Sequence, residues 1–375
     1  MKILLVVTGF PSVSQPARST FNFTYAHELA LNHKVTILYI RAINPKRPLI
    51  KRTQHNNIDI VELSIILPFF GLFKQIPVFA ALFRLVLPLL KFDVDVIQGV
   101  GGHTSIAAYL LSKKLRKPYF LHFIGGDINT DLPYFFNNQM FKDSIFHCSF
   151  LAFESKALEN IFDTYFTNIK NKGVIYRGIK LAEYDYHFDS PYEINVLFLG
   201  GMPENSNLKG GFTLLESINE LNKKTLATKL HFYIGGPEIP EMSAFIKGIS
   251  NPNMEIHIIG AINKTEVKKY MAKSHLVIIP SLSEGLPNVM WEAMATGNMI
   301  IASKVGGIPE ILNDTTLGVL INSNAPNELT EALFNITSEP KKIENYVKNA
   351  RNKVESFNYQ SFIDKNVTLF HNSST

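Results

Sequence analysis

The sequence predicts an α/β protein made of two doubly wound domains that face a central cleft, and three observations support this prediction. Short apolar runs alternate with stretches of helical periodicity along the chain, which is typical of a parallel sheet covered by helices on both faces. The alternation restarts after about residue 185, so the chain contains two such arrays. A chain of 375 residues also exceeds what one hydrophobic core usually supports.

The amino-terminal array comes first and forms a predicted domain of residues 1–188. Its strands are apolar runs bounded by Gly, Pro or Asn, and the segments between them have helical periodicity. The expected strands are 3–7, 34–40, 94–98 and 118–124, and the expected helices are 26–32 and 105–117.

The carboxyl-terminal array forms a predicted domain of residues 189–356, which follows a boundary segment (176–193) rich in turn formers and charges. Ligands of doubly wound sheets bind at the carboxyl ends of the strands, so the loops that follow these strands are the candidate site. The expected strands are 194–200, 229–236, 254–260, 275–280 and 299–303, and the expected helices are 211–224, 265–274 and about 288–297.

The composition indicates a globular protein with a sizeable core, because 46% of the residues are hydrophobic and 18% are charged. Cys148 is the single cysteine, which excludes an intramolecular disulfide framework and a CxxC metal or redox motif. The first residues, MKILLVVTGF, have no small-residue cleavage site and are expected to form a buried strand rather than a secretory signal. We therefore expect a cytoplasmic protein.

The positive charge is concentrated in the first half of the chain. Residues 1–188 hold 21 Lys+Arg and 13 Asp+Glu, a net charge of +8, whereas the remainder holds 16 and 19, a net charge of −3. Two interpretations are open: the first half contacts an anionic partner such as a membrane surface or a lipid-linked phosphate, or it is a solvated lysine-rich surface. No nucleic-acid partner is predicted.

The segment 65–92 departs from the alternating pattern because it is almost continuously apolar and aromatic. Charged residues and three prolines interrupt it, so no stretch reaches the roughly 20 residues that a membrane-spanning helix needs. Two interpretations are open: a buried pair of helices, or contact with an anionic membrane at the inner face of the cytoplasmic membrane. The residues expected to make that contact are Phe69, Phe70, Phe73, Phe79 and Phe83, beside Lys74, Arg84 and Lys91.

The stretch SEGLPNVMWEAMATG, residues 283–297, follows a predicted strand and carries two glutamates eight positions apart, Glu284 and Glu292. The proline between them suits a helix start. The first helical turn, 288–290, then has N–H groups without intrahelical acceptors, and such donors bind phosphate. An ionised glutamate only accepts hydrogen bonds, so Glu292 suits a vicinal diol such as ribose, and Glu284 a sugar hydroxyl. Taken alone, the two glutamates are equally consistent with a helix cap and a solvated side chain.

The chain around this stretch, SEGLPNVMWEAMATGNMIIASKVGGIPEIL, closely resembles the donor-site signature of family 4 glycosyltransferases, in which two glutamates flank seven residues and a VGG-x-PE loop follows. The resemblance implies the GT-B fold, in which two Rossmann-like domains bind a nucleotide-sugar donor mainly through the second. It also implies retention of configuration at the sugar carbon, with no metal and no covalent cofactor. By position, Glu292 is expected to bind the ribose and Glu284 the donor hexose. The residues expected to line the sugar and the diphosphate are Gly285, Leu286, Pro287, Asn288 and Val289.

The segment FLGGMPENSNLKGGFTLLES (198–217) resembles the family's strand, loop and helix, which begin with FxGR and continue to a Lys-Gly pair. The resemblance makes Gly200 and Gly201 donor-contacting residues, and Lys209 the cation that neutralises the leaving diphosphate. A cation is needed there because bond cleavage places negative charge on the β-phosphate. Gly201 stands where the family has an arginine, and three residues are candidates to replace it: Arg18, Arg177 and Lys304.

Two further loops, YIGGPE (233–238) and IIGAIN (258–263), resemble the family's loops that contact the nucleobase mostly through the main chain. The expected contacts are Gly235 and Ile259. Main-chain contacts do not identify the base from sequence, so a UDP- or a GDP-linked donor is expected without a choice between them.

In the first half of the chain, LHFIGGDI (121–128) resembles the family's strand end with a histidine and a Gly-x-Asp turn. His122 and Asp127 are therefore candidates to touch the reacting sugar or to orient the acceptor hydroxyl, although His122 is equally consistent with a core histidine. The stretch GVGGHTS (99–105) could hold an anion or form the acceptor floor, but it is no dinucleotide fingerprint. The final residues, 357–375, resemble the family's last helix, which returns to the first domain.

The resemblance predicts a hexosyltransferase that moves a sugar from a nucleotide-sugar donor to a hydroxyl of a glycan or lipid-linked glycan in surface polysaccharide or glycoconjugate biosynthesis. In the expected front-face mechanism the departing phosphate oxygen takes the acceptor's proton, and Glu284 positions the donor. Two alternatives stay open: a sugar-nucleotide epimerase of the same architecture, and a non-catalytic nucleotide-sugar-binding scaffold, which Gly201 suggests. The sequence specifies neither the sugar, the linkage nor the oligomeric state.

Overall fold

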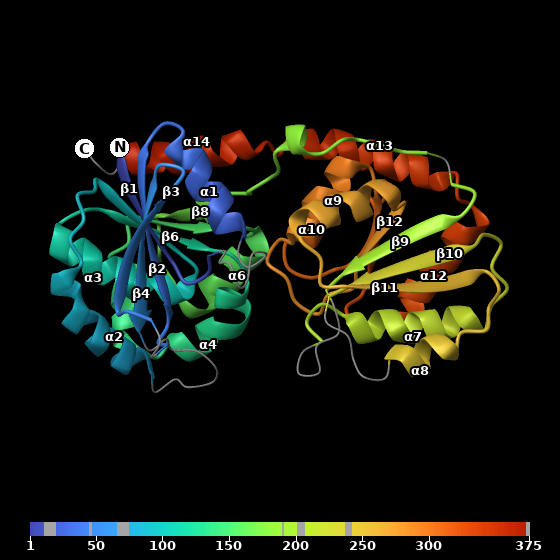
Figure 1. The fold of residues 1–375 in the computed structure, drawn as a ribbon, viewed down its shortest axis with the longest axis horizontal. Helices are drawn as coiled ribbons and strands as arrows, with labels where there is room; N and C mark the ends of the chain where they lie inside the picture. The colour runs from blue at the N-terminus through green and yellow to red at the C-terminus, as the bar shows by residue number, and fades with distance from the viewer. Residues whose placement is uncertain are drawn as a thin grey trace. The chain divides into compact units, whose positions relative to one another are not determined.

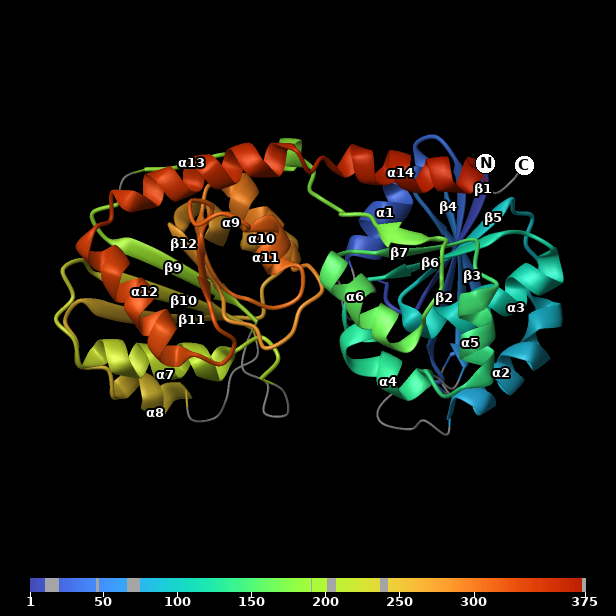
Figure 2. The ribbon, with the colours of Figure 1, turned by 180° about the vertical axis from the view of Figure 1, so that it is seen from behind.

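A computed structural model of the protein describes residues 1–10, 20–44, 47–65, 75–189, 191–200, 207–236 and 242–372. The chain divides into two compact units, Met1–Tyr176 with Gln360–Thr375, and Arg177–Tyr359. Each unit holds one mainly parallel sheet flanked by helices (Figure 1, Figure 2). The predicted α/β class with two Rossmann-like domains is therefore confirmed.

The amino-terminal unit contains an eight-stranded sheet in the order β3-β4-β2-β1-β5-β6-β7-β8. Its central strands are apolar runs because a parallel strand is buried on both faces. Among the described strands of this unit, only β3 and β4 pair antiparallel, as a hairpin at one edge that the sequence did not predict. The strands are β1 (Lys2–Val7), β2 (Lys34–Ala42), β3 (Ile50–His55), β4 (Ile58–Ile65), β5 (Val96–Val100), β6 (Tyr119–Phe123), β7 (Phe150–Phe153) and β8 (Lys172–Val174).

The helices of this unit include the last helix of the chain, α14, whose residues from Gln360 belong to it. Phe362 and Phe370 of α14 pack on the rings of Tyr25 and Phe120, at centroid distances of 5.2 and 5.0 Å. The helices are α1 (Thr20–Ala30), α2 (Gln75–Val86), α3 (Ser105–Leu115), α4 (Leu132–Phe135), α5 (Gln139–Phe146), α6 (Lys156–Tyr165) and α14 (Tyr359–Asn372).

The apolar segment 65–92 contributes α2 to the core of this unit. Phe79 and Phe83 are fully buried there, so the predicted membrane contact through these two residues is wrong. The remaining residues of that prediction are Phe69, Phe70, Phe73 and Lys74, which lie outside the described residues, and Arg84 and Lys91, which are exposed. Among the helices that the structure describes, none combines the length and the hydropathy needed to cross a bilayer.

The carboxyl-terminal unit contains a fully parallel six-stranded sheet in the order β11-β10-β9-β12-β13-β14. Its strands are β9 (Ile194–Leu199), β10 (Leu230–Gly235), β11 (Met254–Gly260), β12 (Leu276–Ile279), β13 (Met299–Ser303) and β14 (Val319–Ile321). Its helices are α7 (Gly211–Asn222), α8 (Met242–Lys247), α9 (Lys264–Lys273), α10 (Asn288–Thr296), α11 (Ile308–Ile311), α12 (Pro326–Ser338) and α13 (Lys342–Glu355).

The unit boundary follows Tyr176, whereas the sequence places the domain boundary after residue 188. The residues between these two positions pack on the carboxyl-terminal unit. The backbone N–H of Ile179 donates to the Phe357 carbonyl, and the Glu183 carboxylate lies 3.2 Å from Nζ of Lys264 on α9. This segment therefore carries side chains into the carboxyl-terminal unit.

Candidate functional site

The carboxyl edge of the second sheet holds the candidate site. Chain order reverses between β9 and β12, because β10 and β11 lie on one side of β9, and β13 and β14 lie beyond β12. Such a switch point leaves a crevice at the strand ends, where ligands of open α/β sheets bind. Lys209 follows β9 and Glu284 follows β12, so both predicted residues lie at this point.

Two loops at this edge are joined through their backbones. The N–H of Leu282 donates to the carbonyl of Leu208 at 2.8 Å. Gly210 has a φ of +72°, and a Cβ on it would lie 1.8 Å from the carbonyl oxygen of Pro280. The Lys-Gly pair of the sequence therefore has a structural reason, because only glycine lets the β9 loop approach the β12 loop this closely.

Lys209 and Glu284 form an ion pair at the junction of the two loops. Nζ of Lys209 lies 2.7 Å from Oε1 of Glu284, and the hydroxyl of Ser281 donates to the same oxygen at 2.7 Å. The glutamate side chain is 8% exposed, whereas the lysine side chain is 49% exposed. The acid is therefore fixed against the protein, and the lysine remains accessible to an anion.

Helix α10 begins at this edge after Pro287, whose φ is −71°, and ends at Gly297 in the left-handed conformation. The N–H of Met290 donates to the Pro287 carbonyl at 3.1 Å, so it is not the open donor that the sequence predicts. The N–H groups of Asn288 and Val289 occupy the first two helical positions, where the helix supplies no acceptor. These two groups are the candidate phosphate donors.

Arg177 stands beside the start of α10, where its Nη1 donates to Oδ1 of Asn288 at 2.7 Å. Of the two candidates for the missing arginine that the structure describes, Arg177 is the one placed at this helix end. Lys304 is exposed after β13, and Arg18 lies outside the described residues. Arg177 is buried beside the positive end of the helix dipole, so it adds positive charge at this helix end.

Glu292 lies inside α10, and the hydroxyl of Tyr184 donates to its Oε1 at 3.0 Å. Burial raises the pKa of Glu292, while the Tyr184 hydrogen bond and the charges of Lys264, Lys268 and Arg177 act in the opposite direction. Burial and the Glu292 carboxylate also raise the pKa of Tyr184, so the tyrosine stays a donor. A carboxylate accepts about four hydrogen bonds, so one tyrosine leaves it capacity for a diol.

The glycines of the VGG-x-PE stretch pack against the loop that carries Glu284. Gly306 has a φ of +53°, and a Cβ on it would lie 2.2 Å from the backbone oxygen of Glu284. The N–H of Gly307 donates to the carbonyl of Gly285 at 2.7 Å. The loop after β13 therefore holds the Glu284 loop in place.

The remaining donor-site predictions in this unit lie together at the ends of β9, β10 and β11. The N–H of Gly200 donates to the carbonyl of Gly235 at 3.1 Å. A Cβ on Gly200 would lie 2.7 Å from Cβ of Lys209, and a Cβ on Gly235 would lie 3.3 Å from Cδ1 of Ile259. These residues are mutual neighbours beside Lys209, whereas Gly201 lies outside the described residues.

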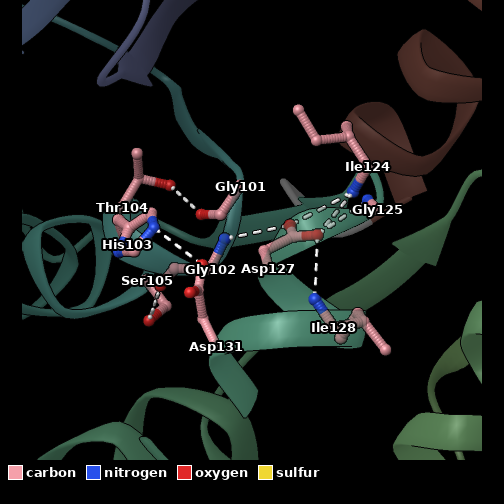
Figure 3. A network of polar contacts seen from close by, with 10 residues as sticks. All are labelled: Gly101, Gly102, His103, Thr104, Ser105, Ile124, Gly125, Asp127, Ile128 and Asp131. Atoms are coloured by element: carbon pink, nitrogen blue, oxygen red, sulfur yellow. Dashed lines mark hydrogen bonds and ion pairs between the residues drawn. The ribbon is translucent and has the colours of Figure 1, made fainter. Parts of the chain in front are cut away.

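In the amino-terminal unit, Asp127 follows β6 and its carboxylate is bound by backbone N–H groups (Figure 3). Oδ2 accepts from Gly102 at 3.0 Å, Oδ1 accepts from Gly125 and Ile128 at 2.8 and 3.1 Å, and the N–H of Ile124 lies near both oxygens. Burial raises the pKa of Asp127 against these hydrogen bonds. Because the carboxylate is buried and joins the loops after β5 and β6, its position does not suit the predicted contact with sugar or acceptor.

His122 lies on β6 with 0% of its surface exposed, and its ring centroid is 5.6 Å from that of Phe362 on α14. Of the two interpretations left open by the sequence, the core histidine fits this position. The GVGGHTS stretch forms a short 3₁₀ helix, Gly102–Thr104, and the start of α3. His103 in this stretch lies 2.9 Å from Oδ2 of Asp131, beside the Asp127 network (Figure 3).

The sequence did not single out three residues that shape the edge: Tyr184, Ser281 and Gly306. Ser281 had a local signal, because a hydroxyl three residues before a glutamate in a loop is a common hydrogen-bond partner. Gly306 belongs to the VGG-x-PE motif, but nothing in the sequence indicated why a glycine is needed at that position. Tyr184 lies in the boundary segment, 108 positions from Glu292, so nothing local indicates their contact.

Comparison with known proteins shows that this chain is similar to glycosyltransferases. Residues 193–339 match the family model described as Glycosyl transferases group 1. A Bacillus subtilis glycosyltransferase assigned to teichuronic acid biosynthesis, TuaC, is 25% identical over 370 residues, which cover 89% of this chain and 88% of that protein. The carboxyl-terminal unit therefore contains a glycosyl transferases group 1 domain, and the chain has glycosyltransferase homologues.

Solved glycosyltransferase structures of the GT-B type match the fold over nearly the whole chain. Sucrose-phosphate synthase from Thermosynechococcus elongatus has a TM-score of 0.75 at 17% identity, covering 99% of this chain and 98% of that one. HepE of Anabaena, solved in complex with UDP-glucose, has a TM-score of 0.70 at 16% identity, covering 98% and 99%. The GT-B fold class is thus confirmed, since likeness at such identities concerns the fold alone.

Proposed function

We propose that this protein is a retaining family 4 glycosyltransferase, which transfers a hexose from a nucleotide-sugar donor to a hydroxyl of a glycan or lipid-linked glycan. The observation that carries the proposal is the 2.7 Å contact between Lys209 and Glu284. These residues lie 75 positions apart and meet at the switch point of the sheet. The pair joins the expected cation for the leaving diphosphate to the expected acid for the donor sugar.

The donor would bind across the start of α10. Its diphosphate would accept hydrogen bonds from the N–H groups of Asn288 and Val289 and meet the side chains of Lys209 and Arg177. Glu292 would accept hydrogen bonds from the ribose hydroxyls, next to Tyr184. UDP-sugars come first among the candidate donors, because HepE was solved with UDP-glucose, and GDP-sugars come second.

The chemistry assigned to the protein is stabilisation of charge. Cleavage of the glycosidic bond moves negative charge onto a phosphate oxygen, and fixed cations stabilise that charge without reorganisation. Lys209 supplies one cation, and Arg177 takes the place of the arginine that Gly201 replaces. The departing oxygen accepts the acceptor's proton on the same face of the sugar, so configuration is retained. Glu284 then positions the hexose, and no protein carboxylate is needed as a base.

A surface polysaccharide or glycoconjugate is the proposed product. The net charge of +8 in residues 1–188 and the relative assigned to teichuronic acid biosynthesis support an anionic or lipid-linked acceptor. A lipid-linked acceptor would bring the enzyme to the inner face of the cytoplasmic membrane. Leu85 and Leu89, which are 74% and 56% exposed, would make that contact beside Arg84 and Lys91.

Titration of the purified chain with UDP-, GDP- and ADP-sugars tests the donor site. One donor is expected to bind, and Glu292→Ala is expected to weaken it by about 1–3 kcal/mol, because hydrogen bonds to a charged group are lost. Glu331→Ala removes an exposed glutamate of α12 in the same unit and should leave the affinity unchanged. If no donor binds, or if Glu292→Ala binds as tightly as the wild type, the proposed donor site is wrong.

Turnover separates the enzyme from a non-catalytic scaffold. With the donor found above and lipid-linked acceptors, Lys209→Gln should lower the rate about 10²–10³-fold, because one fixed charge at the leaving group is lost. The anomeric configuration of the product, read by NMR, should equal that of the donor. A product of inverted configuration, or donor binding without any product across these acceptors, would contradict the proposed activity.

A further inference from the structure

Two histidines and a glutamate form a cluster on the second sheet. His231 is the second residue of β10, and Glu255 and His257 lie on the neighbouring edge strand β11. In the parallel register His231 is opposite Glu255, and Tyr233 is opposite His257. Side chains alternate between the two faces along a strand, so these residues share one face of the sheet.

The three side chains converge at distances that suit a single metal ion. Oε2 of Glu255 lies 3.1 Å from Nδ1 of His231 and 3.6 Å from Nε2 of His257. One ligand atom from each residue lies within 4.8 Å of the others. A tetrahedral zinc ion with bonds of about 2.0–2.2 Å separates its ligand atoms by about 3.3–3.6 Å. Two of the three separations are therefore already close to those of a zinc site.

A second carboxylate orients His231. Nε2 of His231 lies 2.8 Å from Oε2 of Glu193, the residue before β9. Metal-binding histidines commonly donate their other ring N–H to a carboxylate in this way. With that proton on Nε2, Nδ1 presents a lone pair to Oε2 of Glu255, which is also an acceptor. Two acceptors 3.1 Å apart repel each other unless a proton or a metal ion lies between them.

His257 provides an independent indication. Its Nε2 is a buried atom with no hydrogen-bond partner within the described ranges of the chain, and buried polar atoms are rarely left so. The ring stacks on Tyr233 at a centroid distance of 4.8 Å, which fixes its orientation.

We propose that His231, Glu255 and His257 bind one divalent transition-metal ion, with Zn²⁺ as the expected ion. Two imidazoles and a carboxylate suit zinc better than magnesium or calcium, which prefer oxygen ligands alone. Lys229 holds the other oxygen of Glu255 at 2.5 Å, which turns Oε2 towards the histidines. A water molecule would complete the tetrahedron.

The proposed ion has a structural role and goes beyond the transfer reaction. The donor loops follow Gly235, the last residue of β10, whereas His231 lies four residues earlier. At about 3.3 Å per residue, roughly 13 Å separate the two positions along the strand. The ion would join β10 to the edge strand β11, and through Glu193 to the start of β9. It is therefore expected to stabilise the unit without contacting the donor.

Metal titration of the whole, tag-free protein tests the site. After treatment with a chelator and its removal, Zn²⁺ should bind with one equivalent by calorimetry and raise the melting temperature, and Co²⁺ should give the visible absorption of a four-coordinate ion. His257→Ala and Glu255→Gln should each weaken binding at least about tenfold, and Glu193→Gln by about tenfold. His187→Ala is the matched control, because it removes a histidine that is also 2.9 Å from a carboxylate, that of Asp189, but that belongs to no cluster of three possible ligands among the described residues.

Two results would overturn the proposal. One is the absence of saturable binding near one equivalent. The other is binding that persists in both His257→Ala and Glu255→Gln. Glu255→Gln keeps the shape of the side chain, so a native circular dichroism spectrum together with lost binding separates loss of a ligand from loss of the fold.

Discussion

The two units use acidic side chains at the carboxyl edges of their sheets in different ways. In the amino-terminal unit, the Asp127 carboxylate accepts hydrogen bonds from backbone N–H groups of two loops. In the carboxyl-terminal unit, Glu284 and Glu292 accept hydrogen bonds from side chains. A side-chain donor can rotate to admit a ligand, whereas a backbone donor cannot turn away without moving its loop. Asp127 therefore stabilises the loops at its sheet edge, whereas Glu284 and Glu292 can bind a substrate.

Replacing Asp127 should have the largest effect on stability. Asp127→Asn brings an amide NH₂ among backbone donors, so buried N–H groups lose their acceptor. Each such group costs about 1–3 kcal/mol, so the free energy of unfolding should fall by roughly 3 kcal/mol or more. Glu284→Gln should cost about 1 kcal/mol, because the half-exposed Lys209 can turn to solvent and the buried Ser281 hydroxyl can still donate to the glutamine oxygen.

Chemical denaturation with two probes measures this difference. Trp291 is the single tryptophan and is buried in the carboxyl-terminal unit, so its fluorescence reports that unit, while far-UV circular dichroism reports both. Asp127→Asn should shift the dichroism transition more than the fluorescence transition. If Asp127→Asn loses no more free energy of unfolding than Glu284→Gln does, the two kinds of acid do not differ.

Gly306 tests how firmly the Glu284 loop is held. Gly306 and Gly260 both have positive φ, +53° and +63°, so an alanine at either position is strained by about 1–2 kcal/mol. At Gly306 the new Cβ also lies 2.2 Å from the Glu284 carbonyl, whereas at Gly260 no atom of the described residues lies within 4 Å. Gly306→Ala should therefore destabilise the protein by about 1–3 kcal/mol more than Gly260→Ala. If the two variants lose equal stability, as measured by Trp291 fluorescence, the Glu284 loop moves to accommodate the new Cβ.

Strands buried on both faces are the easiest to predict from sequence. In β1 and β13 the run of apolar residues is itself the signal, because a central parallel strand has no polar face. The edge strand β3 reads IKRTQH and is exposed at five of its six positions. β3 forms because it pairs with β4, so its own residues show no strand periodicity.

The parts of the site that could be predicted came from a helix start and from a family resemblance. The sequence placed Glu284 and Glu292 around the helix start after Pro287, and the resemblance of 198–217 to the family's loop indicated Lys209. The role of Asp127 was not predictable in this way. The sequence shows an acid after two glycines, but not that the N–H of Gly102, 25 positions away, turns towards it.

Glu292→Gln tests whether burial sets the protonation of an acid in the candidate site. Burial raises the pKa of Glu292, so the folded protein binds its proton more tightly than the unfolded chain does. The resulting stability is present below the unfolded pKa of about 4.3 and is lost as the pH rises through the folded pKa. Glutamine has no charge to bury, so the variant should gain stability relative to the wild type as the pH rises above about 4.3. A difference that stays constant between pH 4.5 and 7.5, measured by denaturation, would contradict this.

The smallest expected effect concerns the two roles of Glu284. As the counter-ion of Lys209 it opposes phosphate binding, and as a sugar ligand it favours the hexose. Glu284→Gln should therefore tighten binding of a nucleoside diphosphate by about threefold, the scale of a half-exposed ion pair, while weakening the matching nucleotide sugar. Ser281→Ala, which loosens the glutamate without changing charge, should not tighten the diphosphate. If Glu284→Gln weakens binding of both ligands equally, Glu284 stabilises its loop as Asp127 does and does not bind the sugar.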